Sequence, residues 1–91
     1  MSTPRITDFH IDDENREKFA AHGLTARQVG RILDGPHVVV RNRKRRRALY
    51  LVVGLDYGGA CIAAPVEPTP DPVVWRPITA WRCKDRERAL L

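Results

Sequence analysis

The sequence is short of hydrophobic runs and of cysteine, and each shortage excludes a class of protein. No apolar stretch in the 91 residues approaches the roughly 20 that a membrane-spanning helix needs. The first residues, Met1 to Arg5, lack the apolar core of a signal peptide, so we expect a cytoplasmic protein. Apolar residues make up 43% of the chain and charged residues 30%, which is typical of a globular protein. This length predicts one domain over residues 1–91.

Metal-binding and phosphate-loop motifs are also missing. Cys61 and Cys83 have no C-x-x-C spacing and no histidine in ligand register, which argues against a structural zinc site. We expect two buried thiols in a reducing cytosol, with a disulfide between them as the alternative. The three histidines are too widely spaced for a local metal motif, and Gly58-Gly59 lacks the helix and lysine of a phosphate loop. No cofactor and no metal are therefore expected.

Positive charge is concentrated at one place in the chain. The formal net charge is +5, and the segment from position 41 to position 47 contains six cations, so the remainder sums to −1. Apolar segments flank this run and predict a hairpin with the cations at its tip. Such a cluster suits RNA phosphates or an acidic partner, and the alternative is a solvated turn. The candidate RNA-binding residues are Arg41, Arg43, Lys44, Arg45 and Arg46.

The order of predicted elements indicates an α+β fold. Acidic residues before position 15 and Gly23 predict a helix over about 13–22, while Thr25 and Gln28 form a capping box for a second helix. Residues 6–10 could form a short strand. Strands are predicted over 37–41, 48–55, 60–67 and 73–81, followed by a short helix from about Asp85. We therefore expect a two-layer domain, with two N-terminal helices packed on an antiparallel four-stranded sheet and a short C-terminal helix.

One segment resembles a known family motif. Residues 15–25 read N-R-E-K-F-A-A-H-G-L-T and resemble the N-x-E-K-x-x-x-H-G-[VL]-T motif of BrnT-like toxins. Weaker matches are Arg47 with the strand 49–51, the strand 77–80, and Glu87 in the last helix. The resemblance implies a single RelE/BrnT-like domain: a small basic ribonuclease of a type II toxin–antitoxin module, which cleaves RNA without a metal and binds a cognate antitoxin.

A metal-free ribonuclease needs a proton acceptor, a proton donor and a cation for the phosphorane charge. The expected catalytic residues are Arg76, Arg82 and Arg47, which could converge on a phosphate, with Tyr50 as a proton donor or base-stacking ring. Glu87 could orient an arginine or act as base. The alternatives are an edge-strand cation for Arg76, a half-buried core ring for Tyr50 and a solvated carboxylate for Glu87.

Three further residues have two interpretations each. His22 is of the residue type that most often serves as a general base, but its place before Gly23 favours a structural role at a helix end. Trp75 and Trp81 could stack on bases, although in so small a domain large aromatics are expected in the core. Two other functions compete with the toxin hypothesis. These are a non-catalytic nucleic-acid-binding or regulatory module that uses the Arg-rich hairpin, and a protein whose cations recognise only an acidic partner.

Overall fold

Two helices begin where the sequence supplies a side-chain cap. The computed structural model describes residues 3–42 and 48–91. Helix α1 (Asp13–Ala21) starts with a capping box between Asp12 and Asn15, and α2 (Ala26–Arg31) starts with the predicted one between Thr25 and Gln28. Gly23, at a φ of 72°, follows α1 in the left-handed conformation that ends helices. Within the described residues no helix is long and apolar enough to cross a bilayer.

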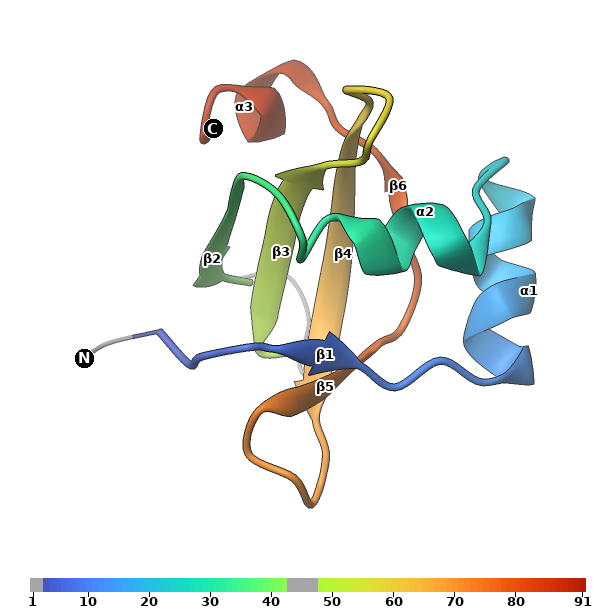
Figure 1. Ribbon diagram of the computed structural model, residues 1–91, viewed down its shortest axis with the longest axis vertical. Helices are drawn as coiled ribbons and strands as arrows, with labels where there is room; N and C mark the ends of the chain where they lie inside the picture. Colours follow the sequence, from blue (N-terminus) through green and yellow to red (C-terminus); the bar gives the residue numbers. More distant parts are fainter. Residues whose placement is uncertain (1–2, 43–47) are drawn as a thin grey trace.

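Six strands form one sheet (Figure 1). They are β1 (Asp8–Phe9), β2 (His37–Arg41), β3 (Tyr50–Leu55), β4 (Cys61–Pro68), β5 (Val74–Pro77) and β6 (Trp81–Arg82). Five of them follow the order β1-β5-β4-β3-β2, and β6 pairs with β4 beside β5. The β1–β5 pair is parallel, while the other pairs are antiparallel.

The α+β class is confirmed, but a purely antiparallel sheet of four strands is wrong. The sheet is mixed because the short strand considered over 6–10 is present as β1 and pairs in parallel with β5, a distant partner that no local signal indicates. The single strand predicted over 73–81 is two strands. β5 pairs with the far end of β4, at Val66–Pro68, and β6 pairs with Ile62 and Ala63 near its start. Pro77, which has no backbone N–H to donate, is the last residue of β5.

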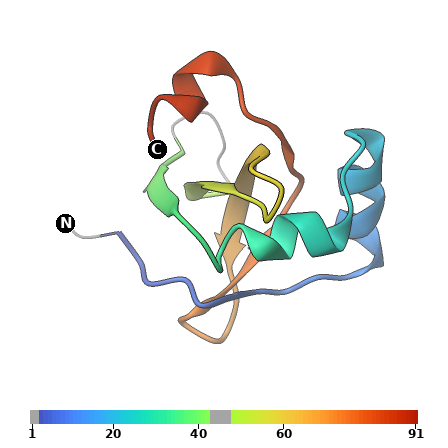
Figure 2. The same ribbon diagram turned by 45° about the horizontal axis from the view of Figure 1, so that its top comes forward.

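The main core lies between α1, α2 and one face of the sheet. Phe19, Val29 and Ile32 from the helical side pack with Val52 and Ile62 from the sheet, and all five are fully buried. Burial of each such side chain contributes about 1.5–3 kcal/mol. Figure 2 shows α1 and α2 on one side of the sheet and the C-terminal helix α3 (Asp85–Arg88) on the other. The C-terminal segment thus covers part of the face that the first two helices leave open.

The second face has a smaller apolar cluster and a covalent link. Val53, Cys61 and Ala63 are buried there, and Trp81 packs against them. Cys61 and Cys83 form a disulfide, with their Cα atoms 5.3 Å apart, so the expectation of two thiols is wrong. The sequence allowed both states, because the antiparallel pairing of β4 with β6 that brings these residues together has no local signal. The disulfide fixes the chain immediately before α3 to the start of β4.

Candidate functional site

A groove of about 950 Å³ lies between α3 and the second face of the sheet. We call it the α3 groove. Three parts of the chain border it: the C-terminal segment from β6 through α3, the end of β2 with neighbouring β3, and the end of α1. These parts are far apart in sequence, so the groove depends on the complete sheet. Its lining residues are His22, Arg41, Asn42, Leu51, Trp81, Arg82, Lys84, Arg86, Glu87 and Leu90.

The rim of the α3 groove is strongly basic. Arg41, Arg82, Lys84 and Arg86 all line it, and all four side chains are exposed to solvent. Arg82 and Lys84 flank the disulfide-bonded Cys83, so the covalent link sets the position of their backbone. Four cations around one hollow create a positive potential that attracts a polyanion. Arg41 is also the first cation of the basic run, so the groove and the run are adjacent in sequence.

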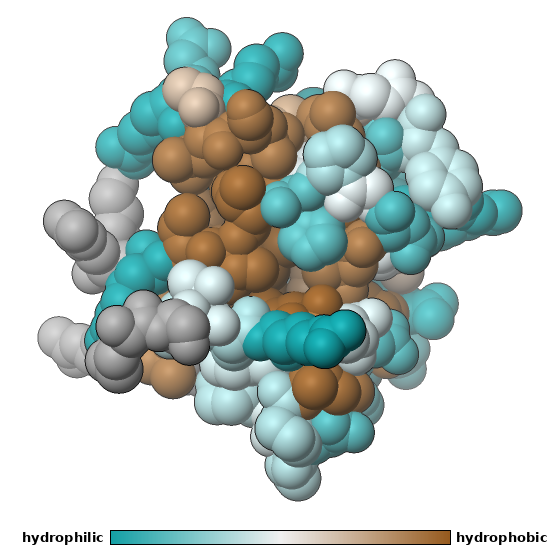
Figure 3. Space-filling view, turned by 60° about the vertical axis from the view of Figure 1, so that its left-hand side comes forward, coloured by the Kyte–Doolittle hydropathy of each residue, from teal (hydrophilic) through white to brown (hydrophobic). Residues whose placement is uncertain are grey.

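The floor of the groove is apolar. Leu51 projects from β3, Trp81 from β6, and Leu90 follows α3 with 44% of its surface exposed. Figure 3, viewed from the side of β2, shows hydrophobic side chains gathered on this part of the surface, with hydrophilic residues around them. A hollow with cations at its edge and apolar surface inside fits a ligand with both charge and flat apolar groups, as a nucleotide has.

Glu87 is the acidic residue of the groove, and it is not a solvated carboxylate. Only 7% of its surface is exposed. Its two carboxylate oxygens accept hydrogen bonds from the indole Nε1 of Trp81 at 3.1 and 3.2 Å. One of them also accepts the backbone N–H of Lys84 at 2.8 Å, which caps the start of α3. Glu87 therefore orients Trp81 and the start of α3. Because its carboxylate oxygens already accept these hydrogen bonds, they are not available to take a proton from a substrate.

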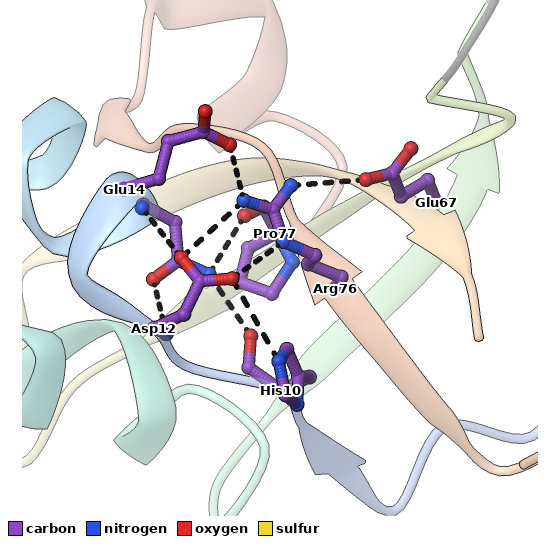
Figure 4. Close-up of polar contacts among 7 residues, drawn as sticks. His10, Asp12, Glu14, Glu67, Arg76 and Pro77 are labelled. Carbon is purple, nitrogen blue, oxygen red and sulfur yellow. Dashed lines mark hydrogen bonds and ion pairs between the residues drawn. The ribbon is translucent and has the colours of Figure 1, made fainter.

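Arg76 lies in a different site and is bound by three carboxylates (Figure 4). Its guanidinium donates to Asp12 at 2.8 Å, to Glu14 at 2.6 Å and to Glu67 at 2.9 Å. Only 15% of its side chain is exposed. Asp12 and Glu14 come from the start of α1, while Glu67 lies opposite Arg76 in the β4–β5 pair. The cluster thus links α1 to the sheet.

The opposite charges of this cluster stabilise each other's ionised forms. The hydrogen bonds from Arg76, with the backbone N–H of Asn15, lower the pKa of Asp12 from 3.8 to about 2. The same bonds, first those to Asp12, raise the pKa of Arg76 above its already high ordinary value. One guanidinium among three carboxylates leaves a local excess of negative charge, which repels a phosphate. The predicted role of Arg76 in stabilising a phosphorane therefore has no support from its surroundings.

Tyr50 also faces away from the groove. It is half-buried against the main core, where its ring meets that of Trp75 edge-on, with 5.5 Å between the ring centroids. Arg47 and the cations Arg43, Lys44, Arg45 and Arg46 lie outside the described residues, so their predicted roles stay predictions. The structure brings together three of the predicted site residues, Arg41, Arg82 and Glu87, and separates Arg76 and Tyr50 from them.

Several groove residues were not predicted as a site. Lys84 and Arg86 come from a short charged helix, which usually indicates only solvation. His22 was expected at a helix end, and it is there: it is the C-terminal cap of α1, and its backbone N–H donates to Phe19. Its exposed imidazole nevertheless also lines the groove. The sequence feature that indicates this site is a basic residue at every second position after Trp81, at positions 82, 84 and 86.

Comparisons with known proteins add no family assignment. No protein-family model matches this chain, and no curated protein matches it either. The BrnT-like resemblance of residues 15–25 consequently remains an expectation from the motif. Among the described residues, no group of three or more histidine, cysteine or acidic side chains is arranged to hold a metal ion.

Proposed function

We propose that this protein binds RNA in the α3 groove, together with the basic run that follows Arg41. The observation that carries the proposal is the placement of four exposed cations around an apolar floor that contains an indole ring. Phosphates would contact the rim, and the flat apolar floor would face the bases. We choose RNA because the motif at residues 15–25 resembles that of ribonuclease toxins.

The test compares two variants that carry the same net charge. One replaces the groove cations Arg82, Lys84 and Arg86 by serine, and the other replaces Arg5, Arg16 and Arg27, which are exposed elsewhere. Each lowers the formal charge from +5 to +2. Affinity for a fluorescent 12-nucleotide RNA is measured over a range of salt concentrations. The groove variant should reduce the log–log salt slope by about 0.7 for each phosphate that the protein no longer neutralises.

The control variant should change the slope much less, because its cations act only through the long-range field. Equal losses in both variants would mean that binding follows net charge alone, which contradicts a specific groove. An acidic peptide of the same length serves as a competitor. Binding of that peptide with no binding of RNA would instead favour a protein partner.

A second function, metal-free RNA cleavage, is favoured by the position of His22. Its imidazole lines the same groove as Arg41 and Arg82. In such a reaction the imidazole would take the proton of a 2′-hydroxyl. The 2′-oxygen would then attack phosphorus, and a guanidinium would stabilise the phosphorane. The bond to the 5′-oxygen would break as that oxygen takes a proton from water or from the imidazolium. This is the toxin hypothesis, and a cognate antitoxin in a heteromeric complex would cover the basic surface.

One substitution distinguishes a loss of RNA cleavage from a loss of RNA binding. His22→Ala should reduce cleavage of RNA by about a hundredfold or more if the imidazole is the general base, and it should leave RNA affinity within twofold. A matched all-DNA strand lacks the 2′-hydroxyl and should stay intact. Expression of the wild-type protein alone should arrest bacterial growth. Normal growth with folded protein present would remove the toxin hypothesis and leave RNA binding.

A further inference from the structure

Trp81 has an unusual environment for one of only two tryptophans in the chain. It belongs to β6, opposite Ala63 of β4, and packs on the apolar cluster of the second sheet face. It is nevertheless only half-buried, and it lines the α3 groove. Trp75 provides the contrast, because it is 7% exposed and belongs to the main core on the other face. One side of the Trp81 indole is thus supported by the sheet, and ring surface remains toward the groove.

The indole is held in a fixed orientation. Its only hydrogen-bond donor, Nε1, is taken by the two carboxylate oxygens of Glu87. Glu87 is buried and is itself fixed by the backbone N–H of Lys84. The ring therefore cannot offer a hydrogen bond to a ligand. A ligand in the groove can therefore contact only the carbon surface of the ring, whose orientation is already set before a ligand arrives.

Cations line the same groove as this ring. Arg82 follows it directly in sequence, and Lys84 and Arg86 lie two and four positions beyond Arg82 on the same rim. An aromatic surface between cations is the arrangement with which proteins bind single-stranded nucleic acids: the bases stack and the phosphates pair with the cations. In a duplex the bases are stacked on each other and their faces are not available to a protein ring.

We propose that Trp81 is a base-stacking platform, positioned by Glu87, and that the ligand of the α3 groove is single-stranded nucleic acid with an unpaired base. This inference rests on the proposed RNA-binding function. It adds the kind of strand that is bound and the residue that contacts the base. Because Nε1 is already occupied, the contact should depend little on base identity, with stronger binding of purines than of pyrimidines through their larger ring area.

Two single strands with the same number of phosphates and one duplex with twice that number test the proposal: an octamer of riboadenylate, an abasic octamer, and the riboadenylate octamer paired with its complement. The single-stranded octamer should bind about 5- to 150-fold more tightly than the abasic one, which is the range for one stacked base. In the Trp75→Phe variant, whose fluorescence comes from Trp81 alone, the single strand should quench the emission and the abasic strand should not.

Two substitutions separate stacking from packing. Trp81→Leu keeps an apolar side chain on the sheet cluster but has no π surface, whereas Trp81→Phe keeps an aromatic ring. The leucine variant should bind the riboadenylate octamer no more tightly than the abasic one, and the phenylalanine variant should keep most of the difference. Affinity for the abasic octamer reports whether the groove itself is intact, and it should be unchanged in both.

Each outcome decides a different part of the proposal. Equal affinity of the wild-type protein for the riboadenylate and abasic octamers, with no quenching, would overturn base stacking and leave phosphate binding in place. Tighter binding of the duplex than of the single strand, compared at equal phosphate concentration, would overturn the choice of ligand. Absence of binding to all three would overturn the proposed RNA-binding function, and this inference with it. The ratio of the wild-type affinities for the riboadenylate and abasic octamers tests base stacking even if the Trp75→Phe variant fails to fold.

Discussion

The Nε atom of Arg76 donates to Asp12 at 2.8 Å and joins two residues that are 64 positions apart in the sequence. The same carboxylate also accepts the backbone N–H of Asn15 and so caps α1. One side chain therefore begins a helix and fixes that helix to β5. Because Arg76 uses its guanidinium on Asp12, Glu14 and Glu67, the arginine that looked most like a catalytic group belongs to the framework of the fold.

The first prediction concerns the pH dependence of this pair. The folded pKa of Asp12 is lowered to about 2, so its contribution to stability is complete above its unfolded pKa near 3.8 and disappears as the pH falls through about 2. Asp12→Asn keeps a good helix cap but removes the charge. The variant should melt below the wild type at neutral pH, and the gap should close between about pH 4 and pH 2. Thermal unfolding across this range measures it.

A double variant supplies the control for this prediction. Asp12→Asn should have a much smaller effect when Arg76 is already glutamine, because the pair is then broken before the second change. Equal effects of Asp12→Asn in both backgrounds would show that the two residues are not coupled in solution.

The second prediction concerns Asn15, a fully buried polar residue of α1. Its Nδ2 donates to the carbonyls of His10 and Pro77 at 2.9 and 3.2 Å, and its Oδ1 accepts the N–H of Asp12. Asn15→Ala leaves these backbone groups without partners, and each buried one costs about 1–3 kcal/mol. We expect a loss of about 3 kcal/mol in the free energy of unfolding, measured by urea titration.

The neighbouring residue is the matched control. Arg16 is exposed on the same helix, and Arg16→Ala should change the stability by less than about 0.5 kcal/mol. If Asn15→Ala were as mild as Arg16→Ala, water would have to replace the missing hydrogen bonds at the buried site.

The third prediction concerns Gly54 in β3, which faces α2 at close range. A Cβ at this position would lie 2.9 Å from the Cβ of His37 and 3.0 Å from both the Cβ and the carbonyl oxygen of Ile32. Because one of these neighbours is backbone, the helix end would have to shift, and Gly54→Ala should cost about 1–3 kcal/mol. Gly30→Ala is the opposite case, since nothing lies within 4 Å of its added Cβ. In helix α2 it should be neutral or stabilise by up to about 1 kcal/mol.

The fourth prediction concerns the disulfide between Cys61 and Cys83, whose partners are 22 positions apart. Reduction should lower the free energy of unfolding by about 2–4 kcal/mol, since the unfolded chain regains the freedom of an open loop. Melting temperatures with and without a phosphine reductant measure the change. A variant with serine at both positions should be insensitive to the reductant. A wild-type melting temperature that does not respond to reduction would mean that the bond does not form in solution.

Local features of the fold could be predicted from the sequence because each has a local cause. Thr25 and Gln28 are three positions apart and cap α2 as expected. The valines after Pro36 pair with β3 as the predicted hairpin requires. Trp75 and Trp81 are placed by two different strands instead: β5 pairs with the end of β4 and with β1, and β6 pairs with the start of β4. Strict alternation along one strand would place them on the same face, yet they lie on opposite faces because β5 and β6 are separate strands.

The site could be predicted only in part, for a related reason. Arg41, Arg82 and Glu87 were expected to be functional and do line one groove. The ion pairs of Arg76 could not be predicted, because Asp12 and Glu14 are distant in sequence and already had a sufficient role at the start of a helix. A carboxylate that caps a helix gives no sign in the sequence that it also binds an arginine on a distant strand.

The parallel ladder between β1 and β5 sets an order of events during synthesis. Asp8 pairs with Val74, so the first strand of the chain has no partner until 66 further residues have been made. The hairpin of β2 and β3 needs only neighbouring residues and can form while the C-terminal part is still being translated. The N-terminal strand must therefore remain unpaired for most of this time. The edge of the sheet at β1 therefore closes only once β5 is available.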